Sequence, residues 1–405
     1  MRTFRIDDQV VSSADPEFQG LLADLHVSKS RPVCLCIEPP PEMYVAKLEG
    51  QFHVKRMPDT GATHAPACES YEPPVELSGI GEVLGTAIQE NPDDGTTALK
   101  FGFSLTKGGT KAAPVATDAE TDSVKTDTKK LSLRSVLHYI WEEAGFNRWT
   151  PGMQGKRSWY VIRKYLLQTV QSKTAKGAVL GDILYIPEPF SLEKKDEIDQ
   201  RRLAQMQRII KKEKSLRQLM LVVGEVKEIA QSRYGYKIIL KHLPDCHFMI
   251  AEDLYKRLIK RFQTEIEFSS AFDDSHLILI GTFFVGPTGI PSLDEVALMT
   301  VTANWLPVES EWDKKLIDSL TNAQRSFSKC LRYNLPTTRP LACLVASDTA
   351  PAPTAMYLIP PDADDNYPAS LEQLIAESSL ASWVWQPGTQ TMPPLPVLMR
   401  QGGQR

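Results

Sequence analysis

The stretch RPVCLCIEPPPEMYVAKLEGQFHVKRMPDTGATHAPAC, residues 31–68, decides how the front of the chain folds. It holds Cys34 and Cys36 two positions apart, and a strand with that spacing turns both thiols to one face. It ends with His64 and Cys68, which a tight loop or a helical turn can aim at one point. We therefore expect these four residues to form a Cys₃His site for one structural zinc ion.

Other interpretations of these residues remain open. Free cysteines are usually buried, so Cys34 and Cys36 also fit as small apolar side chains of a strand, with His64 in a loop. His53 is a weaker alternative for the fourth ligand, and the spacing differs from that of paired CxxC knuckles. With all four coordination positions of the zinc ion filled by these residues, none would be open for water. Such a zinc ion can contribute of order 10 kcal/mol to folding.

The residues between the two ligand pairs predict a β-hairpin. Strands are expected over Met43 to Leu48 and over Gln51 to Arg56, joined at the turn pair Glu49-Gly50. Shorter strands are expected over Pro32 to Ile37 and over Ala98 to Leu105. The zinc ion would clamp this hairpin within a β-rich domain.

The 405 residues exceed the usual length of one domain, so we predict a multidomain α+β protein. Residues 106–130 contain almost no large apolar side chains and cannot repay the entropy of ordering, so they mark a linker. Periodic apolar residues predict helices over Leu131 to Ala144 and over Arg157 to Gln171. The predicted segments are a helical lead-in at 1–30, a β-rich zinc-binding domain at 31–105, a disordered linker at 106–130, a basic helical region at 131–217, a mixed sheet domain at 218–310, a C-terminal α/β part at 311–385 and a disordered tail at 386–405.

Composition indicates a protein of the cytoplasm. No stretch approaches the roughly 18 apolar residues of a membrane span, and MRTFRIDDQV lacks the apolar core of a secretory signal, so we expect no membrane association. Six cysteines are too few and too unevenly spread for a disulfide scaffold. In a reducing compartment, the three clustered cysteines favour a metal.

The basic middle of the chain predicts contact with DNA or RNA. Residues 145–265 carry 24 lysines and arginines against 13 acidic residues, although the whole chain has a net charge of -4. The window from 145 to 181 has basic and aromatic residues but no acidic ones, a composition that suits phosphates and bases. The candidate contact residues are Arg148, Trp149, Lys156, Arg157, Trp159, Arg163, Lys164, Lys173 and Lys176. Core aromatics with ordinary surface lysines are the alternative.

RPVCLC, MYVAKLEGQFHVKRMPDTGATH, CESYEPP and SVLHYIWEEAGFNRWTPGMQGKRSWYVIRKYLL together resemble an uncharacterised bacterial domain-of-unknown-function family, number 1173. The resemblance covers about residues 30–385 and includes the clustered N-terminal cysteines, matched here by Cys34, Cys36 and Cys68. Such proteins are typical of plasmids and integrative conjugative elements. The resemblance therefore implies a context of DNA transfer or maintenance, with possible protein partners of a conjugative or plasmid system, rather than a known activity.

The sequence discloses no reaction. It has no GxxxxGK[ST] loop, no GxSxG elbow and no HExxH helix. Asp348 follows a predicted strand where a nuclease core would place its first carboxylate, but one carboxylate cannot make a magnesium site. We expect a zinc-containing nucleic-acid-binding accessory protein rather than an enzyme. A divergent or degenerate metal-dependent nuclease and a protein-only scaffold are the alternatives.

Overall fold

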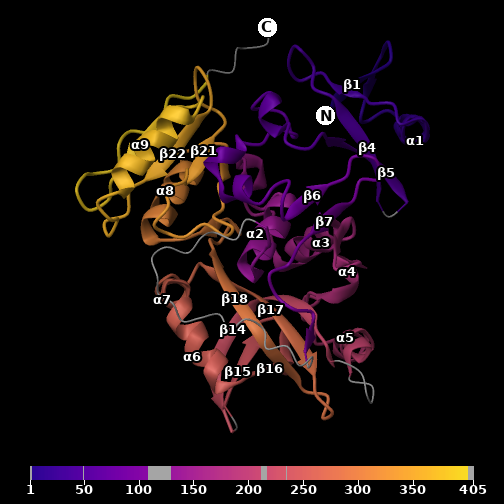
Figure 1. The fold of residues 1–405 in the computed structure, drawn as a ribbon, viewed down its shortest axis with the longest axis vertical. Helices are drawn as coiled ribbons and strands as arrows, with labels where there is room; N and C mark the ends of the chain where they lie inside the picture. The colour runs from indigo at the N-terminus through magenta and orange to yellow at the C-terminus, as the bar shows by residue number, and fades with distance from the viewer. Residues whose placement is uncertain (1, 49, 108–128, 211–216, 234, 400–405) are drawn as a thin grey trace.

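The computed structural model describes residues 2–48, 50–107, 129–210, 217–233 and 235–399. Its helices and strands form several separate sheets, which confirms the predicted α+β class (Figure 1). Most of the predicted linker, residues 108–128, and the last part of the predicted tail, residues 400–405, lie outside the described residues. Among the described helices, none is both long enough and apolar enough to span a bilayer.

The N-terminal part begins with a hairpin of β1 and β2, where a helical lead-in was predicted. Its elements are β1 (Thr3–Ile6), β2 (Gln9–Ser12), α1 (Phe18–Ser28), β3 (Val33–Cys34), β4 (Met43–Leu48) and β5 (Gln51–Arg56). Phe4 and Ile6 of β1 are buried with Phe18 and Leu22 of α1 in one apolar cluster. The predicted helix is present as α1. The residues before it include a strand, because the buried Phe4 and Ile6 alternate with exposed residues along β1. The β4–β5 hairpin confirms the predicted strands.

Five strands close into a barrel in the lower half of Figure 1. They are β14 (Met220–Ser232), β15 (Gly235–Leu240), β16 (Leu243–Ile250), β17 (His276–Val285) and β18 (Pro291–Val301). β14 pairs antiparallel with both β15 and β17, while β16 pairs antiparallel with β15 and parallel with β18. The helices between the third and fourth strands are α6 (Glu252–Arg261) and α7 (Gln263–Ala271). This strand order and helix position are those of an OB-type barrel.

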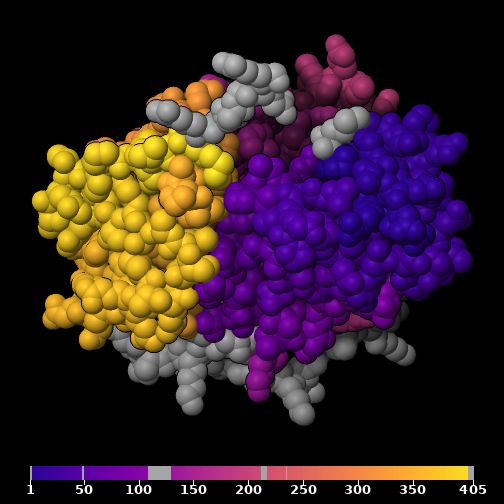
Figure 2. All heavy atoms as spheres, turned by 90° about the horizontal axis from the view of Figure 1, so that it is seen from above, coloured from indigo at the N-terminus to yellow at the C-terminus, as the bar shows by residue number. Residues whose placement is uncertain are grey.

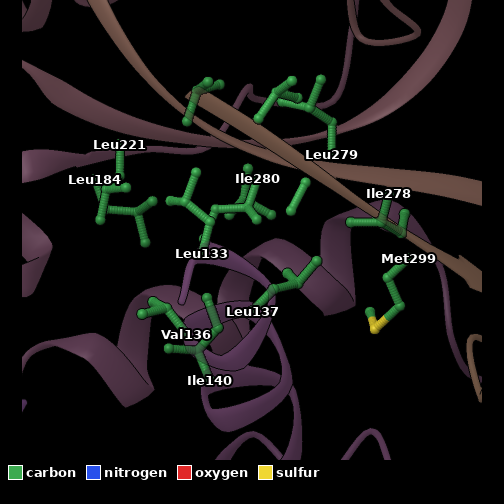
Figure 3. Close-up of a cluster of buried hydrophobic side chains, with 14 of the residues drawn as sticks. Leu133, Val136, Leu137, Ile140, Leu184, Leu221, Ile278, Leu279, Ile280 and Met299 are labelled. Carbon is green, nitrogen blue, oxygen red and sulfur yellow. The ribbon is translucent and has the colours of Figure 1, made fainter. Parts of the chain in front are cut away.

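Helix α2 (Leu133–Glu143) seals the barrel from above. Its apolar residues Leu133, Val136, Leu137 and Ile140 are buried in one cluster with the barrel residues Ile278 and Ile280, and Leu133 lies beside Ile280 (Figure 3). Ser132 caps the helix by accepting a hydrogen bond from the backbone N–H of Ser135 at 3.2 Å. The resulting core is the largest in the molecule and includes residues from Val83 to Tyr333.

The other helices and strands between β5 and the barrel are mostly short. They are β6 (Ile88–Glu90), β7 (Thr97–Leu99), β8 (Thr106–Lys107), β9 (Arg148–Trp149), α3 (Trp159–Val170), β10 (Lys173–Ala175), β11 (Ala178–Val179), α4 (Leu180–Ile183), β12 (Leu184–Tyr185), α5 (Lys195–Met206) and β13 (Arg217–Gln218). Strands β11, β10, β7 and β6 form a four-stranded sheet, and β8 pairs with β13. Helix α3 confirms the helix predicted between residues 157 and 171.

A five-stranded sheet, in the order β23-β22-β21-β20-β9, organises the C-terminal part. The remaining elements are β19 (Pro307–Val308), α8 (Glu311–Asn322), β20 (Phe327–Lys329), β21 (Leu344–Ala346), β22 (Thr354–Leu358), α9 (Tyr367–Glu377) and β23 (Ala381–Trp385). The predicted tail makes backbone contacts as far as Met399, whose N–H donates to the carbonyl of Asp348 at 2.8 Å. Seen from above, the N-terminal and C-terminal parts lie on opposite sides, with residues of the intervening segment between them (Figure 2).

Candidate metal centre

Cys34 and Cys36 are placed by the end of a strand and the turn that follows it. Cys34 is the last residue of β3 and lies opposite Phe4 of β1. Its N–H donates to the carbonyl of Pro41 at 2.8 Å. Because the strand ends at Cys34, a turn brings Cys36 to the same side, and the predicted alternation along one strand was wrong.

His64 and Cys68 are placed by two successive tight turns. A single turn of 3₁₀ helix over Gly61–Thr63 ends at His64, whose N–H donates to the carbonyl of Gly61 at 3.3 Å. The N–H of Cys68 then donates to the carbonyl of Ala65 at 2.8 Å. The expected loop geometry for this ligand pair is therefore present.

The four predicted side chains converge. Their possible ligand atoms all lie within 4.8 Å of one another, so Cys34, Cys36, His64 and Cys68 could hold a metal ion. The Sγ atoms of Cys34 and Cys68 are 3.8 Å apart, and the Nδ1 atom of His64 lies 3.4 Å from Sγ of Cys36 and 3.8 Å from Sγ of Cys68. These separations resemble the edges of a small tetrahedron.

Burial and neighbouring charges set the protonation of the cluster residues. Cys34 and His64 are buried, and Cys36 and Cys68 are half-buried. Burial, followed by the neighbouring thiols Cys36 and Cys68, raises the pKa of Cys34 to about 12. Burial, together with the positive charges of Arg2 and Arg56, lowers the pKa of His64. The imidazole is therefore neutral, as a ligand must be, and a metal ion would have to displace the proton of Cys34.

Backbone amides support two of the sulfur atoms. The N–H of Ala65 donates to Sγ of Cys36 at 3.5 Å, and the N–H of Ser70 donates to Sγ of Cys68 at 3.4 Å. Such donors stabilise negative charge on sulfur. The Nε2 atom of His64 is buried and has no hydrogen-bond partner among the described residues, which departs from the usual support of a ligating histidine. His53 lies on β5 and does not belong to the cluster.

The aromatic residues predicted to contact nucleic acid lie in the core. Trp149 belongs to β9, opposite Phe327, and is 2% exposed. Trp159 is 4% exposed and donates from Nε1 to the carbonyl of Pro187 at 2.8 Å. Buried indoles have no free face on which a base could stack. In contrast, Tyr160 of α3 is 64% exposed.

The predicted basic contact residues divide into two groups. Several have partners within the chain: Arg148 pairs with Glu72, Lys173 with Glu143, and Arg157, Arg163 and Lys176 donate to backbone carbonyls. Burial lowers the pKa of Arg157 to about 10. Lys156 and Lys164 are exposed. Nucleic-acid binding stays a prediction, and fewer of the predicted side chains are available to contact a nucleic acid.

The carboxylate of Asp348 is paired with the guanidinium group of Arg325. Oδ1 accepts hydrogen bonds from Nε and Nη2 of Arg325 at 3.1 and 3.0 Å, and Oδ2 accepts from the N–H of Ser326 at 2.6 Å. The Arg325 side chain is only 4% exposed. Both carboxylate oxygens are thus used in holding the C-terminal sheet, which disfavours a catalytic metal at Asp348.

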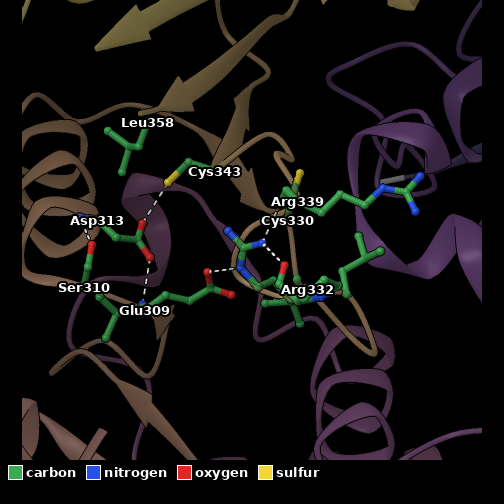
Figure 4. Close-up of polar contacts among 12 residues, drawn as sticks. Glu309, Ser310, Asp313, Cys330, Arg332, Arg339, Cys343 and Leu358 are labelled. Atoms are coloured by element: carbon green, nitrogen blue, oxygen red, sulfur yellow. Dashed lines mark hydrogen bonds and ion pairs between the residues drawn. The ribbon is translucent and has the colours of Figure 1, made fainter. Parts of the chain in front are cut away.

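A buried polar network near α8 was not foreseen from the sequence. Asp313 accepts hydrogen bonds from the thiol of Cys343 at 2.8 Å and from the N–H of Glu309 at 2.9 Å (Figure 4). Lys329 Nζ lies 3.3 Å from Asp313 Oδ2, and Glu309 in turn pairs with Arg332. Because Asp313 has partners at both oxygens, the network is a structural connection between α8 and the C-terminal sheet.

Comparison with known proteins identifies a family but no activity. The family model described as "Protein of unknown function (DUF1173)" matches residues 4–388. No curated protein and no solved structure matches the chain.

Proposed function

We propose, from the premise that the chain belongs to this family of proteins of unknown function, that Cys34, Cys36, His64 and Cys68 bind one structural zinc ion. The observation that carries the proposal is the set of separations between ligand atoms. Zinc with Zn–S bonds of about 2.3 Å and Zn–N bonds of about 2.0 Å implies tetrahedral edges of about 3.8 Å between sulfurs and about 3.5 Å between sulfur and nitrogen. The separation of 3.8 Å between the sulfurs of Cys34 and Cys68 and that of 3.4 Å between Cys36 Sγ and His64 Nδ1 agree with these values. The separation of 3.8 Å between Cys68 Sγ and His64 Nδ1 is slightly longer.

Charge supports the same assignment. Three thiolates and a neutral imidazole around Zn²⁺ carry a net charge of -1, and the charges of Arg2 and Arg56 act on this site. Arg2 is held beside it by a hydrogen bond from Nη2 to Oγ of Ser70 at 2.9 Å. With four protein ligands, the ion would have no open position for water or substrate, so its role is to hold β3 and the loop of His64 together.

Metal analysis of the purified protein and of ligand variants tests this proposal. Wild-type protein should contain about one zinc ion per chain, and Cys36→Ser and Cys68→Ser should each lose most of it. Cys246→Ser is the matched control, because Cys246 is a half-buried cysteine of β16 outside the cluster. Equal zinc content in all four proteins would refute the assignment.

As a second candidate function, we propose binding of DNA or RNA. One specific observation favours it: the exposed ring of Tyr160 stands one helical turn before the exposed Lys164 on α3. An aromatic face beside a cation is the pairing used to bind unpaired bases and phosphates. OB-type barrels often bind oligonucleotides, although a fold by itself does not establish a function.

Fluorescence anisotropy with labelled single-stranded and duplex DNA and RNA tests this second candidate. Binding should weaken steeply between about 50 and 200 mM salt, because phosphate contacts release counterions. The double variant Tyr160→Ser/Lys164→Gln should weaken binding at least tenfold, whereas Lys47→Gln, an exposed lysine of β4, should not. Absence of binding at low salt would favour a protein-only scaffold instead.

The biological setting is part of the same proposal. The resemblance to proteins of plasmids and conjugative elements implies an accessory role in DNA transfer or maintenance, within the cytoplasm. The engaged carboxylate of Asp348 favours this role over that of a metal-dependent nuclease. Incubation of a labelled duplex with magnesium or manganese should therefore give no cleavage.

A further inference from the structure

A polar cavity lies on the opposite face of the hairpin from the apolar N-terminal cluster. It has a volume of about 510 Å³, which is the size of many small-molecule sites. Alternate residues of β5 divide between the two faces: Phe52 and Val54 pack on the apolar cluster, whereas Gln51, His53 and Lys55 line the cavity. The remaining lining comes from the end of α2, from α3 and from the residues that follow it: Glu143, Ala144, Tyr165, Gln168, Thr169, Ser172 and Lys173.

Lys55 is the distinctive residue of this cavity. It is half-buried, and across the described ranges its side chain has no hydrogen-bond or ion-pair partner. Burial, followed by the positive charge of Lys173, lowers the pKa of Lys55, although the carboxylates of Glu143 and Glu90 oppose the shift. A buried cation normally has a partner, because desolvation of an unpaired charge is costly. The ammonium group of Lys55 is therefore suited to pair with the anionic group of a bound ligand.

The other charges around the cavity balance one another. Lys173, which is 1% exposed, lies 2.5 Å from Oε2 of Glu143 and also donates to Thr97 Oγ1 at 3.2 Å. Although burial opposes it, the charges of Lys173, Lys55 and Arg56 lower the pKa of Glu143 to about 2. Arg56 pairs with Glu72 and lies 3.9 Å from Glu90. Glu72 also pairs with Arg148, at 2.9 Å. The four cations Lys55, Lys173, Arg56 and Arg148 therefore face the three carboxylates Glu143, Glu72 and Glu90, which leaves one positive charge in excess around the cavity.

We propose that this cavity binds a small anionic ligand, a phosphate ester or a carboxylate, whose anionic group pairs with Lys55. The hydroxyl and amide groups of Gln51, Gln168 and Thr169 would hydrogen-bond the polar body of the ligand. The ring of Tyr165, which is 46% exposed, provides a flat apolar surface at the rim. The lining contains none of the four metal-cluster residues, and the proposal does not rest on nucleic-acid binding.

Isothermal titration of the full-length protein with inorganic phosphate, adenosine monophosphate and citrate tests the proposal. At least one of the three should bind, with an affinity that falls as salt rises. Preference for phosphate and adenosine monophosphate identifies a phosphate-ester site, and preference for citrate identifies a carboxylate site. Lys55→Met should weaken the binding at least tenfold. The proposal is overturned if none of the probes binds or if Lys55→Met binds as wild type does.

Two further variants keep the test independent of folding. Lys47→Met removes a lysine from the opposite face of the same hairpin, where Lys47 pairs with Phe52, and should leave binding unchanged. Gln168→Glu adds a negative charge at an exposed position of the lining and should weaken anion binding without unfolding the protein. A binding role also predicts that Lys55→Met melts at the same temperature as wild type or a few degrees higher, since it removes an unpaired desolvated charge. A lower melting temperature together with unchanged affinity would assign Lys55 a structural role.

Discussion

Phe4 of β1 lies directly opposite Cys34 of β3 in an antiparallel pair, so the first strand of the chain is joined to a strand that ends on a candidate metal ligand. The same cluster buries Met43 and Val45 of the hairpin against Phe4 and Leu22. Loosening the metal site should therefore loosen β1, β3 and the hairpin together.

Removal of the metal with a chelator should unfold or loosen the N-terminal part selectively. Hydrogen exchange should rise in β1, β3, β4 and β5, while β14 and β17 of the barrel keep their protection. Structural zinc can contribute of order 10 kcal/mol, so the change should be large. Addition of zinc should restore protection, and uniform loss of protection across the barrel would contradict a local role.

The ion pair of Lys173 and Glu143 predicts a stability effect that a second substitution reverses. Lys173→Met should lower the free energy of unfolding by about 3 to 5 kcal/mol, because it leaves the Glu143 carboxylate without its buried partner. The double variant Lys173→Met/Glu143→Gln should recover much of this loss. Urea unfolding of the single and double variants measures the difference, and equal stabilities for both would contradict the argument.

His138 predicts a loss of stability on mild acidification. It is 5% exposed, its Nδ1 accepts the N–H of Tyr333 at 3.1 Å, and burial, followed by the charge of Arg134, lowers its pKa to about 3. As pH falls below about 6.5, the unfolded chain takes up a proton at His138 that the folded protein does not. Between pH 7 and 5 this group should cost about 2 kcal/mol of stability. His138→Asn keeps an acceptor for Tyr333 and should flatten the pH dependence.

Glu142 should give the opposite pH dependence to His138: its contribution to stability should fall as the pH rises. Burial raises its pKa to about 7, and it accepts a hydrogen bond from the hydroxyl of Tyr333 at 2.6 Å. The folded protein therefore holds a proton that the unfolded chain loses as pH rises from about 4.5 to about 7, so this contribution to stability is lost toward neutral pH. Unfolding measured from pH 5 to 7 should show that Glu142→Gln becomes more stable relative to wild type as pH rises. No relative change would contradict the raised pKa.

Asp348→Asn tests whether this carboxylate is structural. Loss of its charge should weaken the contact with the buried Arg325 and lower the free energy of unfolding by roughly 3 kcal/mol. Wild type and variant should be equally inactive toward a labelled duplex with magnesium or manganese. Cleavage by wild type that Asp348→Asn abolishes would contradict a structural role.

Local sequence patterns predicted the hairpin well. Apolar residues in Met43 to Leu48 and alternating residues in Gln51 to Arg56 flank Gly50, which has the positive φ of 82° that a tight turn requires. The observed strands have the same bounds as the predicted ones. The apolar faces of α2 and α3 were equally clear, because a helical repeat is visible in one stretch of chain. The four metal-cluster residues could be named because few residue types bind zinc.

Long-range pairing was not visible in the sequence. Closure of the barrel depends on β14 meeting β17, and burial of Trp149 depends on its pairing with Phe327. No pattern among neighbouring residues in the sequence predicts either contact. Lys173 read as a surface cation for the same reason: its partner Glu143 stands on another element. Basic residues that looked like a contact surface are therefore partly internal, and the cavity beside Lys55 could not be inferred before the hairpin was placed.

X-ray absorption at the zinc edge, on protein purified without added metal, tests the metal centre most directly. The proposed site predicts about one zinc ion per chain, with three sulfur neighbours at about 2.3 Å and one nitrogen at about 2.0 Å. Protein free of stoichiometric zinc, or zinc surrounded by nitrogen and oxygen alone, would contradict the assignment of Cys34, Cys36, His64 and Cys68.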